Sequence, residues 1–255
     1  MSSRNVSRLQ RINMSPAGHV NADDRHDRQD VVQDPLGHLE RDNSPPKGGS
    51  NSGSQVNSVT QANNFIDFVF LERMPNLIKD TPGLYPSAPL PPFTFTVEKT
   101  AITNRDLVVN VTMGGLKNFD TAVRRFGDCE PGEEAGNASI TCRLSFDGIA
   151  ADIFTMTKGD NLLATVKSVT VEAVVRNSTG LFDFTKAPNR PGFVRAFVVQ
   201  HADFYITPGD NLDLNAIRMS EFTYYIARYL REELQSNLYG SYKRMLDFAF
   251  GPMTQ

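Results

Sequence analysis

The sequence predicts an α+β fold in which a curved antiparallel sheet wraps a long C-terminal amphipathic helix, with a shorter helix before the sheet. The first observation is that apolar residues recur every four positions from Phe222 to Leu246, as on one face of a helix. The second is that several stretches between residues 94 and 209 alternate apolar and polar residues, as half-buried strands do. The third is that Gly, Pro, Asn and Asp separate these stretches, which predicts short connections and an antiparallel meander.

The chain divides by composition into two parts. All 17 Phe and all 7 Tyr lie at or after Phe65, and residues 1–64 are rich in Ser, Asn, Asp, Arg, Gly and Pro. Such a segment cannot bury enough apolar area to offset the entropy of ordering, so we predict a disordered tail over 1–59 and a single domain over 60–255. The tail carries equal numbers of basic and acidic residues, which argues against a nucleic-acid partner. No stretch approaches the ~18 apolar residues of a membrane span, and no apolar signal-peptide segment is visible near Met1.

The first predicted elements of the domain are a helix and an extended connection. Residues 61–80 carry apolar residues at roughly helical spacing, and Pro75 is expected to kink or split the helix there. Residues 81–95 contain five prolines, so they are expected to form neither a helix nor a central strand. Strands are then predicted within the segments 94–104, 105–127, 140–154, 162–177 and 192–209.

The last predicted element is a helix over 219–250. Ser220 is expected to cap it, and Gly240 is expected to bend it. A helix of about 30 residues is roughly 45 Å long. It must therefore lie along the whole length of a sheet to bury its apolar stripe.

The two cysteines, Cys129 and Cys142, bracket the turn-forming segment EPGEEAGN. A hairpin would place them opposite each other, so a disulfide is the favoured interpretation, with two buried free thiols as the alternative. A zinc site is disfavoured because two cysteines without nearby histidines leave the tetrahedron half empty.

Three N-x-S/T triplets in the domain, at Asn110, Asn137 and Asn177, predict glycosylation. Together with the cysteine pair they predict a secreted glycoprotein. The missing signal peptide then means either that Met1 is not the true start, or that the chain is cytosolic and both signals are accidental.

Three segments together resemble the TULIP superfamily, which includes juvenile-hormone-binding and takeout-like proteins, group 7 mite allergens and the halves of bactericidal/permeability-increasing protein. FIDFVFLERMPNLIK with GLYPSAPLPPF is similar to the N-terminal helix and proline-containing link of that family. VKSVTVEAVV with VRAFVVQHADFYITPGDNLDLN resembles its long bent strand pair, and FTYYIARYLREELQSNLYGSYKRMLDFAF resembles its C-terminal helix. The resemblance covers roughly residues 61–250. The tail, the absent signal peptide and the position of the cysteines depart from the family pattern.

The resemblance implies a carrier that binds a hydrophobic small molecule, such as a lipid, fatty acid or terpenoid, in an apolar tunnel between the long helix and the sheet. Each ligand methylene removed from water would contribute roughly 0.8 kcal/mol. An ordinary packed core is the alternative interpretation of the same side chains. The residues expected to line the tunnel are Phe65, Val69, Phe222, Ile226, Tyr229, Leu230 and Leu234.

Three other functions compete with a carrier. A surface-interaction protein of innate-immune type could recognise microbial lipid or a protein partner, with peripheral contact between Arg124, Arg125 or Arg143 and anionic headgroups. A jelly-roll sandwich with a dispensable terminal helix would have no lipid-related role. For an enzyme, His201 and Asp203 form the one candidate pair, and a solvent-facing pair on a strand is the favoured interpretation. No catalytic residue, metal or cofactor is predicted, and the sequence does not predict the oligomeric state.

Overall fold

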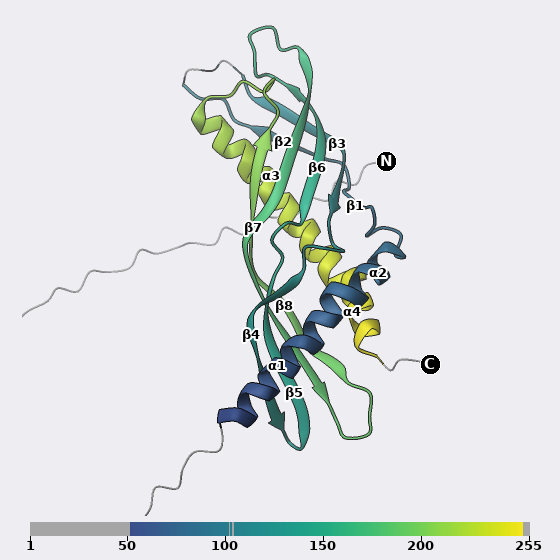
Figure 1. The fold of residues 1–255 in the computed structure, drawn as a ribbon. Helices are drawn as coiled ribbons and strands as arrows, with labels where there is room; N and C mark the ends of the chain where they lie inside the picture. Colours follow the sequence, from purple (N-terminus) through teal and green to yellow (C-terminus); the bar gives the residue numbers. More distant parts are fainter. Residues whose placement is uncertain (1–51, 102, 104, 252–255) are drawn as a thin grey trace, which may run out of the picture. The chain divides into compact units, whose positions relative to one another are not determined.

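The structure is a computed structural model that describes residues 52–101, 103 and 105–251. In this part of the chain an eight-stranded antiparallel sheet is preceded by an N-terminal helix and followed by a long C-terminal helix (Figure 1). The predicted α+β class is therefore confirmed. The strands are β1 (Ser87–Pro89), β2 (Phe93–Val97), β3 (Leu107–Lys117), β4 (Arg124–Glu134), β5 (Asn137–Ser145), β6 (Ala150–Lys158), β7 (Val166–Lys186) and β8 (Phe193–Pro208).

The longest strand, β7, connects two parts of the sheet. Its first half pairs with β6, its second half pairs with β5, and β8 pairs with it between Val171 and Thr185. The strand order is β1-β3-β6-β7-β5-β4, with β2 also paired to β3. The β4–β5 hairpin thus attaches to the far end of β7 and not beside β3, so the prediction of a simple meander is wrong.

Two predicted strands are divided by turns that contain apolar residues. The segment 105–127 breaks after β3 at Asn118, which has a φ of 70°, and the segment 140–154 breaks over residues 146–149. Phe146 and Ile149 lie in the second turn but are fully buried, so buried apolar residues continue through the turn although the spacing of two is interrupted. Conversely, Asn177 was predicted to lie at a strand end, and β7 runs through it with a register shift and a φ of 55°.

The N-terminal helix begins earlier than predicted. Helix α1 (Ser52–Phe68) starts eight residues before position 60, so residues 52–59 belong to a helix and not to the predicted tail. Residues 1–51 of that tail lie outside the described residues. A π-helical segment, η1 (Val69–Arg73), separates α1 from α2 (Met74–Lys79), where Pro75 occupies the first turn. Helical residues run without a break from 52 to 79, and the π-helical segment lies directly before Pro75. The helix therefore does not split at Pro75, because helical residues continue on both sides of it.

The C-terminal helix runs continuously through α3 (Ala216–Asn237), a π-helical segment η2 (Leu238–Tyr242) and α4 (Lys243–Phe250). It begins at Asn215, whose side chain accepts a hydrogen bond from the Arg218 amide, so the prediction of Ser220 as cap is wrong. Because an α-helix turns once in 3.6 residues, a strict spacing of four drifts around it. The wider π turn, which contains Gly240, counteracts this drift. The stripe stays buried at every position: Phe222, Ile226, Leu230, Leu234, Leu238, Tyr242 and Leu246.

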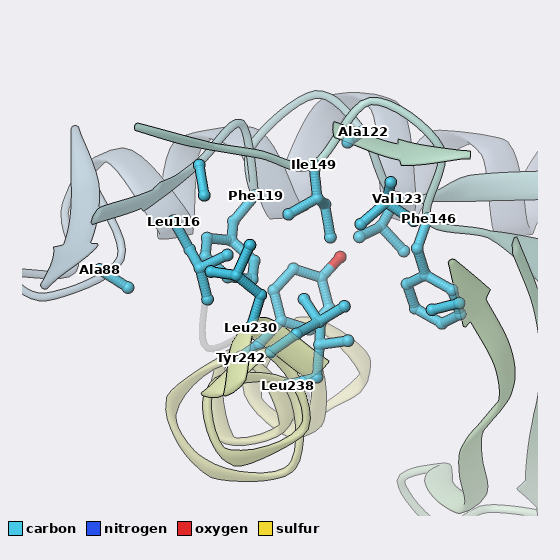
Figure 2. Close-up of a cluster of buried hydrophobic side chains, with 14 of the residues drawn as sticks. Ala88, Leu116, Phe119, Ala122, Val123, Phe146, Ile149, Leu230, Leu238 and Tyr242 are labelled. Carbon is cyan, nitrogen blue, oxygen red and sulfur yellow. The ribbon is translucent and has the colours of Figure 1, made fainter. Parts of the chain in front are cut away.

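The core lies between this stripe and the inner face of the sheet. Figure 2 shows Tyr242, Leu238 and Leu230 pointing from the helix towards Phe119 and Ile149 of the turns. The Tyr242 ring is 1% exposed, and burial raises the pKa of its hydroxyl above the ordinary value because the phenolate would be desolvated. The long helix is therefore a structural element of the core along its whole length.

Candidate ligand pocket

An open pocket of about 550 Å³ lies where α1 and η1 meet β5, the end of β7 and the end of α4. Its floor consists of three aromatic rings from three elements. The ring centroid of Phe65 lies 5.6 Å from that of Phe184 and 5.7 Å from that of Phe250, and the last two lie 4.8 Å apart. These distances are typical of favourable aromatic pairs. We call Phe65, Phe184 and Phe250 the aromatic floor.

The other lining residues form an apolar wall and a polar rim. Phe68, Val69, Ala138, Ile140, Pro191 and Ala249 contribute apolar surface. Arg73, Lys186 and Arg190 are the charged residues that line the pocket, and the lining residues in the described part of the chain include no Asp or Glu. The lining is completed by Gly192 and Gly251.

The residues predicted to line a tunnel are divided between this pocket and the core. Phe65 and Val69 line the pocket. Phe222, Ile226, Leu230 and Leu234 expose 0% of their surface and belong to the hydrophobic core, although Leu234 also borders a small pocket of about 160 Å³ next to β8. A tunnel along this stripe is thus not open in the structure, because the side chains of the sheet fill the space against the helix.

Tyr229 lies outside both groups. Its ring stacks on Phe93 with 3.8 Å between centroids, and its hydroxyl donates a hydrogen bond to the Pro91 carbonyl. Partial burial, and secondarily the nearby Glu233, raise the pKa of Tyr229 to about 12. It therefore joins the long helix to the proline-rich connection and does not line the pocket.

Sequence reasoning missed Phe184 and Phe250. Phe184 lies in the second half of β7, beyond the predicted end of that strand at 177, and Phe250 lies at the last position of the predicted helix. For Phe250, the sequence does offer a signal, because phenylalanines are concentrated at the start and at the end of the domain. The sequence could not show that β7 continues far enough to place Phe184 next to Phe65 and Phe250.

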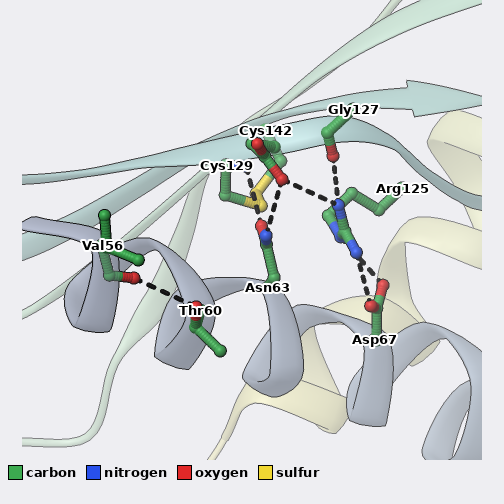
Figure 3. A network of polar contacts seen from close by, with 9 residues as sticks. Val56, Thr60, Asn63, Asp67, Arg125, Gly127, Cys129 and Cys142 are labelled. Atoms are coloured by element: carbon green, nitrogen blue, oxygen red, sulfur yellow. Dashed lines mark hydrogen bonds and ion pairs between the residues drawn. A yellow bond between two sulfur atoms is a disulfide. The ribbon is translucent and has the colours of Figure 1, made fainter.

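A polar network fixes α1 against the β4–β5 hairpin (Figure 3). The predicted disulfide between Cys129 and Cys142 is confirmed. The Cys129 amide donates to Asn63 Oδ1 at 2.9 Å, and Asn63 Nδ2 donates to Asp128 at 2.9 Å. Asn63 precedes Phe65 by two residues, so this network positions one ring of the aromatic floor.

The Arg125 guanidinium strengthens the same contact. It donates to both carboxylate oxygens of Asp67, at 2.9 and 2.6 Å, and to the Gly127 carbonyl. The hydrogen bond to Asp67 raises the pKa of Arg125. The sequence suggested that Arg124, Arg125 or Arg143 could contact anionic lipid headgroups. Arg125 is poorly suited to this contact because its charge is paired with Asp67. Arg124 and Arg143 are exposed.

The predicted surface pair of His201 and Asp203 forms on β8. His201 Nε2 lies 2.8 Å from Asp203 Oδ2, both side chains are about half exposed, and Arg231 lies 3.8 Å from the same carboxylate. Within the described residues, no group of three His, Cys, Asp or Glu side chains is arranged to hold a metal. No helix among them has the length and apolar character needed to span a membrane.

The three predicted glycosylation sites all reach the surface of the sheet. Asn110 is exposed on β3, although its Oδ1 accepts a hydrogen bond from Thr94. Asn137 is half-buried at the start of β5, next to the hairpin turn, and Asn177 is exposed in β7. Glycosylation of these sites stays a prediction.

Comparison with known proteins gives one informative relative. No protein-family model matches the chain. The salivary anticoagulant protein P23 of Ixodes scapularis is 40% identical over 198 residues, which cover 77% of this chain and 89% of the relative. A salivary relative and a disulfide are both consistent with a secreted protein.

Proposed function

Since the chain belongs to the family of the salivary anticoagulant protein P23 of Ixodes scapularis, we propose that it is a secreted protein that hinders blood clotting by binding, without catalysis. The identity across nearly nine-tenths of the relative carries this proposal. The structure supports a binding role through its open apolar pocket. The His201 and Asp203 side chains border only a small pocket of about 160 Å³ and are about half exposed to solvent, which is a poor setting for catalysis.

We expect the purified protein to delay thrombin generation in plasma in a stoichiometric manner. A binding inhibitor loses effect once its target is in excess, whereas an enzyme keeps acting with time at low dose. The measurement is thrombin generation over a series of protein concentrations and preincubation times. A substoichiometric dose whose effect keeps growing with preincubation, or new cleavage products in the plasma, would contradict the non-enzymatic mechanism. No delay at large molar excess would contradict the anticoagulant role.

A second candidate function, favoured by the pocket, is the binding or carriage of a hydrophobic small molecule. The volume of about 550 Å³ lies in the range of ligand pockets, and most of the lining is apolar. The site we propose is the aromatic floor and not the stripe of the long helix. This is the kind of ligand that the resemblance to the TULIP superfamily implies, at another position along the fold.

Gly192→Ala is expected to abolish hydrophobic ligand binding. A Cβ atom at Gly192 would lie 2.1 Å from Cζ of Phe184, so the ring must move, and the neighbouring free space is the pocket. The matched control is Gly240→Ala, where a Cβ meets nothing within 4 Å. The measurement is native mass spectrometry of protein from a eukaryotic secretory host, followed by organic extraction.

Wild type and Gly240→Ala should carry a hydrophobic adduct that Gly192→Ala lacks. Thermal unfolding of the three proteins separates pocket filling from general destabilisation. An adduct that persists in a folded Gly192→Ala protein would place the ligand elsewhere.

A further inference from the structure

We propose that the pocket selects amphiphiles with an anionic headgroup, binding the apolar chain on the aromatic floor and the headgroup at Arg73, Lys186 and Arg190. This inference rests on the proposal that the pocket binds a hydrophobic molecule, and it adds the chemical class of the ligand. We call these three side chains the cationic rim.

The cationic rim comes from three different elements that converge on one opening. Arg73 ends η1, Lys186 ends β7, and Arg190 lies in the connection between β7 and β8. The aromatic floor lies between these elements, with Phe184 two residues before Lys186. An apolar chain on the floor would therefore have its polar end next to positive charge.

The charges of the cationic rim are not used within the described part of the protein. Arg125 pairs there with Asp67, and Arg195 pairs with Asp183 and Glu134. By contrast, Arg73, Lys186 and Arg190 form no ion pair with any residue that the structure describes. With no carboxylate among the described lining residues, nothing in the pocket wall offsets the three positive charges.

Three positive charges without a neighbouring carboxylate favour a ligand with a carboxylate or phosphate headgroup over a ligand with a neutral one. Arginine presents a planar set of donors that matches both anions. A single exposed ion pair contributes little, but three cations that line one opening attract the same headgroup. A terpenoid or sterol without charge would fill the floor and leave the rim without a partner.

The test compares oleate with oleyl alcohol, which share one chain and differ in headgroup charge. Affinities are measured by displacement of a fluorescent fatty-acid probe from the full chain. The rim variant is Arg73→Gln/Lys186→Gln/Arg190→Gln. The control variant, Lys99→Gln/Arg105→Gln/Lys158→Gln, removes the same charge from exposed residues on the β2–β3 connection and at the end of β6.

We expect wild type and the control variant to bind oleate about tenfold more tightly than oleyl alcohol, and the rim variant to bind both about equally. The preference should shrink as salt is added, because the rim is solvent-exposed. Equal affinities in wild type, or a preference that survives in the rim variant, would overturn the inference while hydrophobic binding itself stands. If neither ligand binds to wild type, hydrophobic binding at this pocket and the inference both fall.

A second arm identifies where the anionic headgroup comes from. Wild type and the rim variant are sedimented with phosphatidylcholine vesicles that contain or lack phosphatidylserine. Rim-dependent binding to the phosphatidylserine vesicles supports the inference with a membrane lipid as ligand. Binding of oleate without binding of vesicles supports the inference and indicates that the ligand is a free amphiphile. Vesicle binding that is equal in wild type and rim variant would contradict a headgroup site at the rim.

Discussion

Leu230→Ala is expected to lower the free energy of unfolding by about 2–5 kcal/mol, the usual cost of removing a fully buried leucine. Leu230 lies near the middle of the long helix and exposes 0% of its surface. In Figure 2 it points from the helix into the same cluster as Tyr242 and Leu238. The loss combines the transfer of the missing methyl groups with the cavity that tight surroundings cannot close.

The control for this prediction is Ile217→Ala on the same helix. Ile217 is 70% exposed, and alanine is the better helix former, so its replacement should change the free energy of unfolding by no more than about 0.5 kcal/mol. Both variants are measured by urea unfolding followed by circular dichroism. A cost below about 1 kcal/mol for Leu230→Ala would indicate loose packing around the helix. It would reopen the possibility of a tunnel along the stripe.

Truncation of the chain before the C-terminal helix tests the alternative that the domain is a jelly-roll sandwich with a dispensable terminal helix. Seven stripe positions from Phe222 to Leu246 are buried against the sheet. A sandwich with a dispensable terminal helix would not depend on them. The burial therefore predicts that the domain unfolds when the chain is truncated at Met219.

The long C-terminal helix and the disulfide were predictable from the sequence because each has a clear local pattern. A spacing of four kept from Phe222 to Leu246 has one physical interpretation, an amphipathic helix. The Cys129–Cys142 pair was predictable because both residues flank one turn. These predictions needed only local pattern.

The strand boundaries were not predictable because tertiary contacts decide them. The turn at 146–149 carries the turn-forming pair Asp147 and Gly148, but the buried Phe146 and Ile149 on either side extend the apolar pattern through it. Asn177 and Ser178 look like a turn, yet β7 passes through them because the Ser178 amide and hydroxyl both donate to Asp147, 31 residues earlier. Local sequence cannot contain that partner.

The candidate pocket also combines residues that local sequence predicts with residues that only the tertiary structure brings together. Phe65 and Val69 were predicted because they lie on a recognisable helix face. Phe184 and the cationic rim were missed, since their proximity depends on how far β7 runs and on where α1 packs. The network of Asn63 and Asp67 with the β4–β5 hairpin is what sets that position.

Cys129→Ser with Cys142→Ser is expected to lower the free energy of unfolding by about 3 kcal/mol, because the bridge limits the unfolded chain over a short loop. The bridge also has a local role. The register of β4 against β5 shifts between Phe126 and Glu130, so Cys129 lies outside the ladder of paired residues. The disulfide is then the direct link from Cys129 to β5, and the Cys129 amide is the donor that reaches Asn63.

Loss of the disulfide should therefore also weaken ligand binding at the aromatic floor, because α1 carries Phe65. The matched control is Asn63→Ala, which removes the contact between α1 and the hairpin but keeps the disulfide, and should cost about 1 kcal/mol. Urea unfolding and oleate binding are measured for wild type, both variants and wild type in reducing agent. Reduced wild type should match the double serine variant, which itself should not respond to reductant. If the double variant unfolds at the same urea concentration as wild type, the β4–β5 hairpin is held by its strand pairing alone, and the disulfide does not position α1.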